Sequence, residues 1–152
     1  FNVFGRRQSP DGAYAAVIPK FVEQLMRYES PVINGDGEYS RDSTYIDNVL
    51  QMNWLAMNTE NPKAVNTVYN TAYGENTTLN QLVGYLKELL GFYDARIADV
   101  DIVYGPVRKG DIPHSLASID KARQLLGYDP RFNMKQGLRE AVKWYWENLK
   151  RK

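Results

Sequence analysis

Two arginines stand next to the ends of expected strands, where a side chain can reach a bound ligand. Arg41 precedes a β-compatible stretch over 43–46, and Arg108 follows a stretch over 100–104 that a Gly-Pro pair ends. A guanidinium carries a permanent charge and a planar fork of donors, which suits the two phosphates of a nucleoside diphosphate. The two arginines are therefore a candidate clamp for a pyrophosphate. On spacing alone, the commoner case is a solvated surface charge or a partner for a nearby aspartate.

Further polar residues lie close to these turns. The carboxylate of Asp111 can accept hydrogen bonds from a ribose diol or can pair with Arg41 or Arg108, and the residue types favour neither. The amide of Asn34 can face a base edge, although an Asn-Gly pair is more typical of a simple turn. A lone histidine such as His114 is more often a hydrogen-bonded structural residue, so we assign it no catalytic role.

Composition excludes several classes of partner and site. With 19 Lys and Arg against 18 Asp and Glu, the net charge of +1 provides no general attraction to nucleic acid or to an anionic membrane. The absence of cysteine excludes disulfides and thiolate metal sites and fits a reducing compartment, so we expect a cytoplasmic protein. A single histidine excludes a multi-histidine metal centre. No apolar run approaches the roughly 20 residues that cross a bilayer.

The sequence also lacks the common catalytic motifs. It contains no Gly-x-Gly-x-x-Gly, no Walker loop, no Gly-x-Ser-x-Gly and no His-Glu-x-x-His. None of its 11 tyrosines is followed by a lysine four residues later. The chain taken alone therefore has no recognisable catalytic machinery, and its candidate chemistry is binding.

The elements that must position these residues follow from hydrophobic periodicity. Apolar spacing predicts helices over 17–26, 48–57, 79–90 and 119–126 and a last helix after Asn133, with short strands over 1–4, 32–33, 43–46, 67–72 and 100–104 and a loop over 5–12. The expected helix caps are Asp47, Thr77 or Thr78, Ser118 and Asn133. The helix over 48–57 has little polar face and is expected to be buried between layers. We expect one compact unit of the α/β class, or α+β as an isolated piece.

Taken together, these segments resemble nucleotide-sugar epimerases and dehydratases of the extended short-chain dehydrogenase superfamily. The resemblance covers the whole chain and is greatest to UDP-N-acetylglucosamine 4-epimerases. It rests on strings that occur in the family's order: Phe1 to Gln8, Ala15 to Lys20, Ile33 to Gly37, Ser40-Arg41-Asp42, Tyr45 to Val49, Tyr69-Asn70, Arg108-x-Gly-Asp111, and Ile119 to Ala122 with Leu126-Gly127-Tyr128-x-Pro130.

This resemblance implies a Rossmann fold whose amino-terminal domain holds NAD and the catalytic Tyr-x-x-x-Lys. Both missing motifs belong to that domain, so residues 1–152 correspond to the carboxy-terminal, nucleotide-sugar-binding part, and we interpret the start at Phe1 as a cut within a late Rossmann strand. The implied reaction interconverts UDP-N-acetylglucosamine and UDP-N-acetylgalactosamine, or UDP-glucose and UDP-galactose, through a 4-keto sugar and bound NAD. Family enzymes are commonly homodimers.

The resemblance also assigns binding roles to particular positions. The diphosphate clamp and its support are expected from Arg41, Arg108 and Asp111; the remaining contacts to the uracil, the nucleotide and the sugar are expected from Asn2, Gln8, Ala16, Val17, Lys20, Val32, Asn34 and Ser115. A small side chain at position 115 leaves room for a 2-N-acetyl group, so serine there points to N-acetylated substrates. One departure is Ser43, which stands where the family usually has an aromatic residue.

Two alternatives stay open at this stage. The first is a nucleotide-sugar dehydratase or decarboxylase of the same superfamily, because the nucleotide site is shared and the residues that decide the chemistry lie largely outside this chain. The second is a non-catalytic nucleotide-binding domain, for which the absence of catalytic motifs is natural.

Overall fold

The structure is a computed structural model that describes residues 2–11 and 16–149. The expected strand over 1–4 begins at Phe1, and the expected loop over 5–12 ends at Gly12. These two positions lie outside the described residues.

Three helices form the main body of the molecule. They are α1 (Val17–Met26), α3 (Leu79–Gly91) and α5 (Met134–Asn148), and each turns an apolar stripe toward the other two. Thr78 and Gln81 form a reciprocal capping box at the start of α3, and Asn133 and Gln136 do the same for α5. Local sequence therefore fixes both helix starts, as the cap residues predict.

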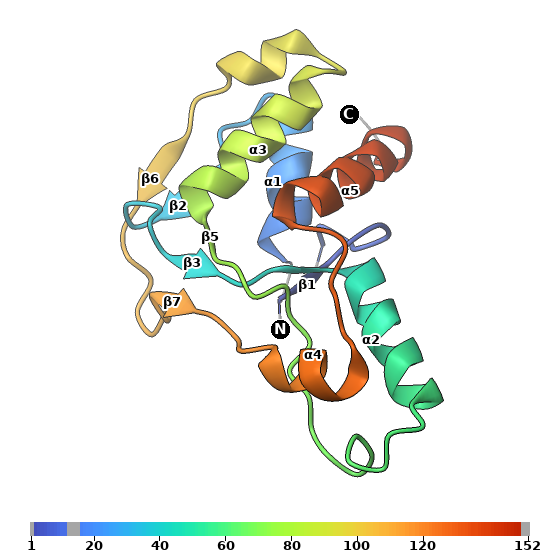
Figure 1. The fold of residues 1–152 in the computed structure, drawn as a ribbon. Coiled ribbons are helices and arrows are strands. Elements are labelled where there is room, and N and C mark those ends of the chain that lie inside the picture. Colours follow the sequence, from blue (N-terminus) through green and yellow to red (C-terminus); the bar gives the residue numbers. More distant parts are fainter. Residues whose placement is uncertain (1, 12–15, 150–152) are drawn as a thin grey trace.

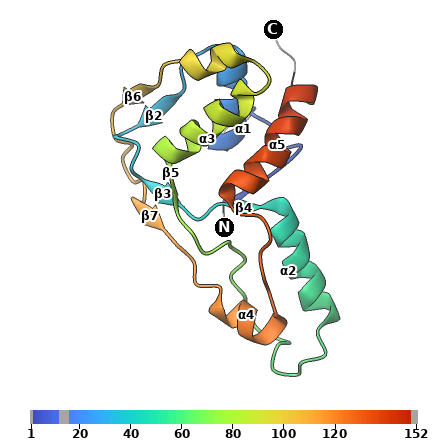
Figure 2. The ribbon, with the colours of Figure 1, turned by 45° about the horizontal axis from the view of Figure 1, so that its top comes forward.

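Two further helices lie apart from this body, below it in Figures 1 and 2. They are α2 (Ile46–Asn58) and the short α4 (Asp120–Leu126), which Gly127 ends in the left-handed conformation at φ 65°. A 3-10 helix, η1 (Ala95–Asp99), follows α3 at the opposite end of the molecule.

The described strands are two or three residues long and pair into three small sheets. β1 (Val3–Phe4) is parallel to β4 (Thr44–Tyr45), and β2 (Val32–Asn34) is parallel to β6 (Val103–Gly105). In the third sheet β3 (Ser40–Arg41) lies between antiparallel β5 (Thr77–Thr78) and parallel β7 (His114–Ser115). This mixture of parallel pairs and packed helices is an α/β architecture, as predicted.

The buried side chains form two separate clusters. The larger cluster fills the space between α1, α3 and α5, where Leu25, Leu86 and Leu138 are each 0% exposed. The smaller cluster lies between α2, α4 and the segment over 64–72, and it includes Met52 and Tyr128. The candidate site described below lies beside the larger cluster, next to α1.

Two predictions are wrong for the lower part of the molecule, which comprises α2, α4 and the segment over 59–76. The segment over 67–72 forms no strand, and its Val68 is 85% exposed, because no neighbouring strand among the described residues pairs with it. The helix α2 is not buried between layers: Trp54 and Met57 are 61% and 77% exposed. The apolar composition of α2 predicts burial between layers, but the described chain packs against only one side of it.

Two expected caps are also displaced. The N-cap of α2 is Tyr45, and Asp47 lies within the first turn of the helix. The N-cap of α4 is Ile119, while the Ser118 hydroxyl accepts a hydrogen bond from the Asp120 amide at 3.4 Å. No helix among the described residues has the length and apolar character needed to cross a membrane.

Candidate functional site

Arg41 is held at the centre of the three-stranded sheet. Its neighbour Ser40 is 5% exposed, and because side chains alternate along a strand, Arg41 points to the other face. The Arg41 Nη1 donates to the carbonyl oxygens of Ser40 at 2.9 Å and Pro113 at 3.3 Å. These two bonds restrict the orientation of the guanidinium.

The parallel strands β2 and β6 bring Asn34 and Arg108 to the same cavity. β2 ends at Asn34, which is in register with Gly105 at the end of β6, and the Gly35 amide donates to the Gly105 carbonyl at 3.0 Å. Parallel strands end at the same edge of a sheet. Arg108 follows β6 by three residues and therefore lies at the same edge as Asn34.

The third contribution comes from the first turn of α1. Val17 and Lys20 are three residues apart and share a face of the helix. The helix has no acidic residue in its first turn, and its N-cap, Ala16, provides no side-chain cap for the amides. The positive end of the helix dipole and the Lys20 ammonium therefore act in the same direction and favour an anion.

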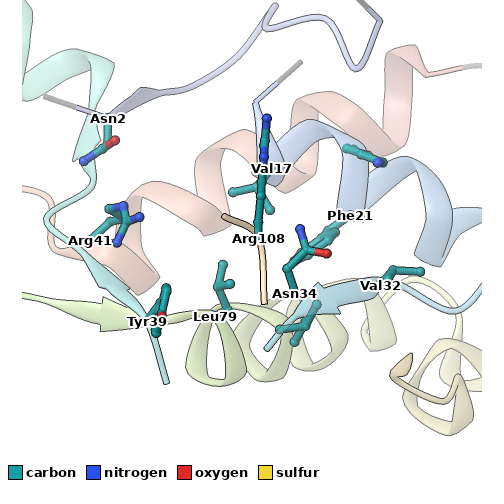
Figure 3. Close-up of a pocket in the computed structure, with 11 residues that line it drawn as sticks. Asn2, Val17, Phe21, Val32, Asn34, Tyr39, Arg41, Leu79 and Arg108 are labelled. Carbon is teal, nitrogen blue, oxygen red and sulfur yellow. The ribbon is translucent and has the colours of Figure 1, made fainter. Parts of the chain in front are cut away.

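These elements enclose one cavity of about 320 Å³. Figure 3 shows Arg41 and Asn2 on one side of it, Asn34 and Val32 on the other, and Arg108 beside Val17 between them. The full lining is Asn2, Val17, Lys20, Phe21, Val32, Ile33, Asn34, Tyr39, Arg41, Leu79 and Arg108. Three of these side chains are cations and none is a carboxylate, so the cavity is suited to an anion with a flat, apolar portion.

A smaller cavity of about 170 Å³ extends this site. It shares Asn2, Val17 and Arg41 with the first cavity and adds Ala16 and Ser43 to the lining. Ser43, the departure from the family pattern, therefore lies beside the candidate site and not at a distant surface.

Three of the predicted contacts, Gln8, Ser115 and Asp111, do not line this cavity or its extension. Gln8 lines a separate cavity beside Arg27 and Trp144, and Ser115 lines another with Asp42 and Leu116.

The convergence of Asp111 with the two arginines is not present in the structure. Asp111 is exposed and does not line the arginine cavity, and among the described residues no ion pair joins it to Arg41 or Arg108. The chain turns between Arg108 and Asp111 at Gly110, which has a φ of 88°, and the Asp111 amide donates to the Arg108 carbonyl at 3.3 Å. This turn carries the carboxylate away from the cavity.

The structure adds lining residues that the sequence interpretation missed. Phe21 and Leu79 belong to helical stripes, which were interpreted as core only. Tyr39 gave a usable signal: it stands two residues before Arg41, and residues two apart on extended chain share a face.

The whole chain is similar to known nucleotide-sugar enzymes. The model of the family described as GDP-mannose 4,6 dehydratase matches residues 1–141. A curated relative described as a putative UDP-glucose 4-epimerase from Methanocaldococcus jannaschii is 32% identical over 147 residues, which are 97% of this chain and 44% of the relative. The chain thus spans less than half the length of this relative.

Solved structures of nucleotide-sugar epimerases are also similar to this chain over less than half of their length. A UDP-glucose 4-epimerase from Thermotoga maritima with UDP-glucose has a TM-score of 0.85 at 40% identity, over 98% of this chain and 45% of that one. A UDP-N-acetylglucosamine 4-epimerase from Methanobrevibacter ruminantium in complex with UDP-N-acetylmuramic acid has a TM-score of 0.85 at 39% identity, over the same shares. The chain belongs to the GDP-mannose 4,6-dehydratase family of nucleotide-sugar enzymes, within the extended short-chain dehydrogenase superfamily.

Proposed function

We propose that this chain is the nucleotide-sugar-binding part of a UDP-sugar 4-epimerase. The observation that carries the proposal is the cavity in which Lys20, Arg41 and Arg108 meet without a carboxylate, beside Asn34 at the end of a strand. The cations would neutralise the diphosphate, and the apolar wall would accept the flat base. The similar structures with UDP-glucose and with UDP-N-acetylmuramic acid support a uridine nucleotide as the ligand.

In this proposal NAD would carry out the redox chemistry, and the residues of this chain would bind the substrate. NAD, which a 26% identical structure of MoeE5 holds together with UDP-glucuronic acid, would supply reversible hydride transfer at C4 of the sugar. The cavity of about 320 Å³ fits one nucleotide end, and the sequence offers no glycine-rich loop for a dinucleotide, so we assign no NAD contact to these residues. Their role is to bind and orient the nucleotide while the sugar turns over.

The proposed substrates are UDP-N-acetylglucosamine and UDP-N-acetylgalactosamine, with UDP-glucose and UDP-galactose as the non-acetylated pair. In the proposed whole enzyme, which we expect to be a cytoplasmic homodimer, an amino-terminal domain would hold NAD and the catalytic residues. Incubation of that enzyme with UDP-N-acetylglucosamine, with the product followed by NMR at C4, tests the reaction. A 4-keto-6-deoxy product would instead identify a dehydratase, the second candidate, which the description of the matching family favours.

The clamp is tested by Arg108→Ala in this chain. Loss of one charged donor from a phosphate site is worth about 1.5–3 kcal/mol, so we expect UDP to bind roughly 10- to 100-fold more weakly by calorimetry. Arg139→Ala is the matched control, because Arg139 is exposed on α5 and does not line the cavity. Equal affinity of the Arg108 variant and the parent for UDP would contradict the clamp.

The sugar preference is tested by Ser115→Tyr in the whole enzyme. Ser115 lines its own cavity of about 190 Å³, and a tyrosine would fill much of that space. We expect the ratio of kcat/KM values for N-acetylated over non-acetylated substrates to fall by about tenfold, comparable to other steric discriminations in a pocket. An unchanged ratio would remove Ser115 from the specificity argument.

A further inference from the structure

The carboxylate of Asp42 is an unusual feature of the region behind the cavity. Asp42 is 1% exposed, and its Oδ1 accepts a hydrogen bond from the Tyr73 amide at 3.1 Å. Its Oδ2 accepts from the amides of Gly74 at 3.0 Å and Ala117 at 3.4 Å. Among the described residues no ion pair joins a cation to this carboxylate, and its three hydrogen bonds from backbone amides compensate its burial.

The backbone of the same residue makes two more connections. The Asp42 amide donates to the Ser115 carbonyl at 3.0 Å, and the Asp42 carbonyl accepts from Asn2 Nδ2 at 3.3 Å. Asp42 thus joins Asn2 at the entry to β1, the segment at 73–74, and both Ser115 at the end of β7 and Ala117 just after it. It directly follows Arg41, whose guanidinium is tied to the chain on the same side through Pro113.

We propose that Asp42 is a positioning residue for the nucleotide site: it fixes the strand that carries Arg41, and it fixes Asn2 and Ser115 relative to that strand. Neither the sequence motifs nor the clamp argument assigns Asp42 a role. The inference rests on the proposed function for its consequence, which is the affinity for a nucleoside diphosphate. Its structural half, the orientation of Arg41, can be measured without any ligand.

A carboxylate is required because three N–H groups converge on two oxygens. Asparagine has nearly the same shape but only one acceptor oxygen, and its amide group would point N–H bonds at one or two of the backbone donors. At least one of the three N–H groups, which lie in partly buried segments, would lose its partner, and we expect the strand to shift to relieve the contact. A shift of β3 moves the Arg41 guanidinium directly, because Arg41 is the preceding residue.

The first measurement is the Arg41 Nε–H signal in NMR spectra of the ligand-free chain. We expect Asp42→Asn to shift this signal and the amide signals of Tyr73, Gly74 and Ala117, whereas Asp101→Asn, a change at an exposed aspartate outside the cavity, leaves them in place. An unmoved Arg41 signal in the Asp42 variant would overturn the inference. This result does not depend on whether the chain binds UDP.

The second measurement is a double-mutant cycle on UDP affinity. Misplacement of a binding group by about 1 Å can cost about 100-fold, so we expect roughly tenfold weaker UDP binding by Asp42→Asn and a clearly smaller further loss, through Asn2 alone, when it is added to Arg41→Ala. A merely structural defect would weaken binding equally in both backgrounds, and additivity would therefore refute positioning through Arg41. Absence of UDP binding by the parent would count against the proposed function, and the Arg41 signal would still decide the role of Asp42.

Should Asp42→Asn not fold, as judged by circular dichroism and a cooperative thermal transition, Asp42→Ser carries the same two measurements. The smaller side chain leaves room for a water molecule to satisfy the amides. The same shift of the Arg41 signal is expected, and its absence overturns the inference in the same way.

Discussion

The body formed by α1, α3 and α5 and the lower part formed by α2 and α4 are held together by different forces. In the body, whole helix faces are buried, and Leu25, Leu86 and Leu138 are completely inaccessible. In the lower part α2 buries only Asn48 and Met52. Its apolar cluster is smaller, and polar bonds add to it: Asn48 bonds to the backbone of residues 131–132, and the Tyr128 hydroxyl donates to the Ala72 carbonyl at 2.8 Å. The stability of the body therefore depends mainly on apolar packing, whereas the stability of the lower part depends more on individual hydrogen bonds.

The largest expected effect of a single substitution is in the body. Leu86→Ala removes a fully buried side chain between three helices and leaves a cavity, so we expect the free energy of unfolding to fall by about 2–5 kcal/mol. Urea denaturation measures the change. Leu50→Ala on α2 is the control; Leu50 is 57% exposed, and we expect a change of less than about 0.5 kcal/mol. Similar losses from both variants would show that the two parts are packed alike.

A polar substitution sharpens the comparison in the lower part. Asn48 Nδ2 donates to the Phe132 carbonyl at 2.8 Å, and Asn48 Oδ1 accepts from the amides of Arg131 at 2.9 Å and Phe132 at 3.1 Å. Asn48→Ala leaves these groups without their partner, and we expect a loss of about 1–3 kcal/mol. Amide hydrogen exchange should accelerate at Phe132 before it does in α3. Uniform acceleration throughout the chain would mean that the two parts unfold as one unit.

The smallest effect concerns alkaline pH. Burial raises the pKa of Tyr128 from its ordinary value of 10.0 to about 12, with the Asp42 carboxylate adding to the shift, and burial raises the pKa of Tyr145 further. The folded chain keeps protons that the unfolded chain loses above pH 10, so the contribution of these two tyrosines to the free energy of unfolding should be constant below pH 10 and should fall as pH rises through the window from 10 to 12.

Two variants divide this alkaline effect between the two parts. Tyr145, whose hydroxyl donates to the Gly5 carbonyl at 2.9 Å, belongs to the body, and Tyr128 belongs to the lower part. Tyr128→Phe and Tyr145→Phe should each make the decline less steep, and Tyr145→Phe should do so more. Denaturation curves at pH 9 and at higher pH test this expectation. If the free energy of unfolding declines as steeply in both variants as in the parent chain, the expectation is contradicted.

The sequence predicts those features of the fold that are set within one turn of helix. The cap at Thr77 or Thr78, the cap at Asn133 and the stripe of α3 are local patterns, and the structure confirms them, with Thr78 as the cap of α3. The segment over 67–72 carries a strand-like pattern, but a strand needs a partner that periodicity does not provide. The same limit applies to α2, where an apolar composition does not reveal which faces have neighbours.

The candidate site was predictable to a similar degree. Arg41, Arg108 and Asn34 were singled out because each stands at a strand end, and the structure places all three around one cavity. Asp111 was grouped with them by its distance in sequence, but Gly110 turns the backbone between them. The hydrogen bonds of Asp42 join residues 31 to 75 positions apart, and no pattern in the sequence indicates them.

The lining of the cavity extends from Asn2 to Arg108 along the chain, and β3 pairs with segments on both sides of α3. Such non-local pairing is acquired late in folding, after the loops that separate the segments have closed. Under the proposed function, UDP binding would therefore report on the folding of the whole chain, because the cavity is complete only when segments on both sides of α3 have paired with β3.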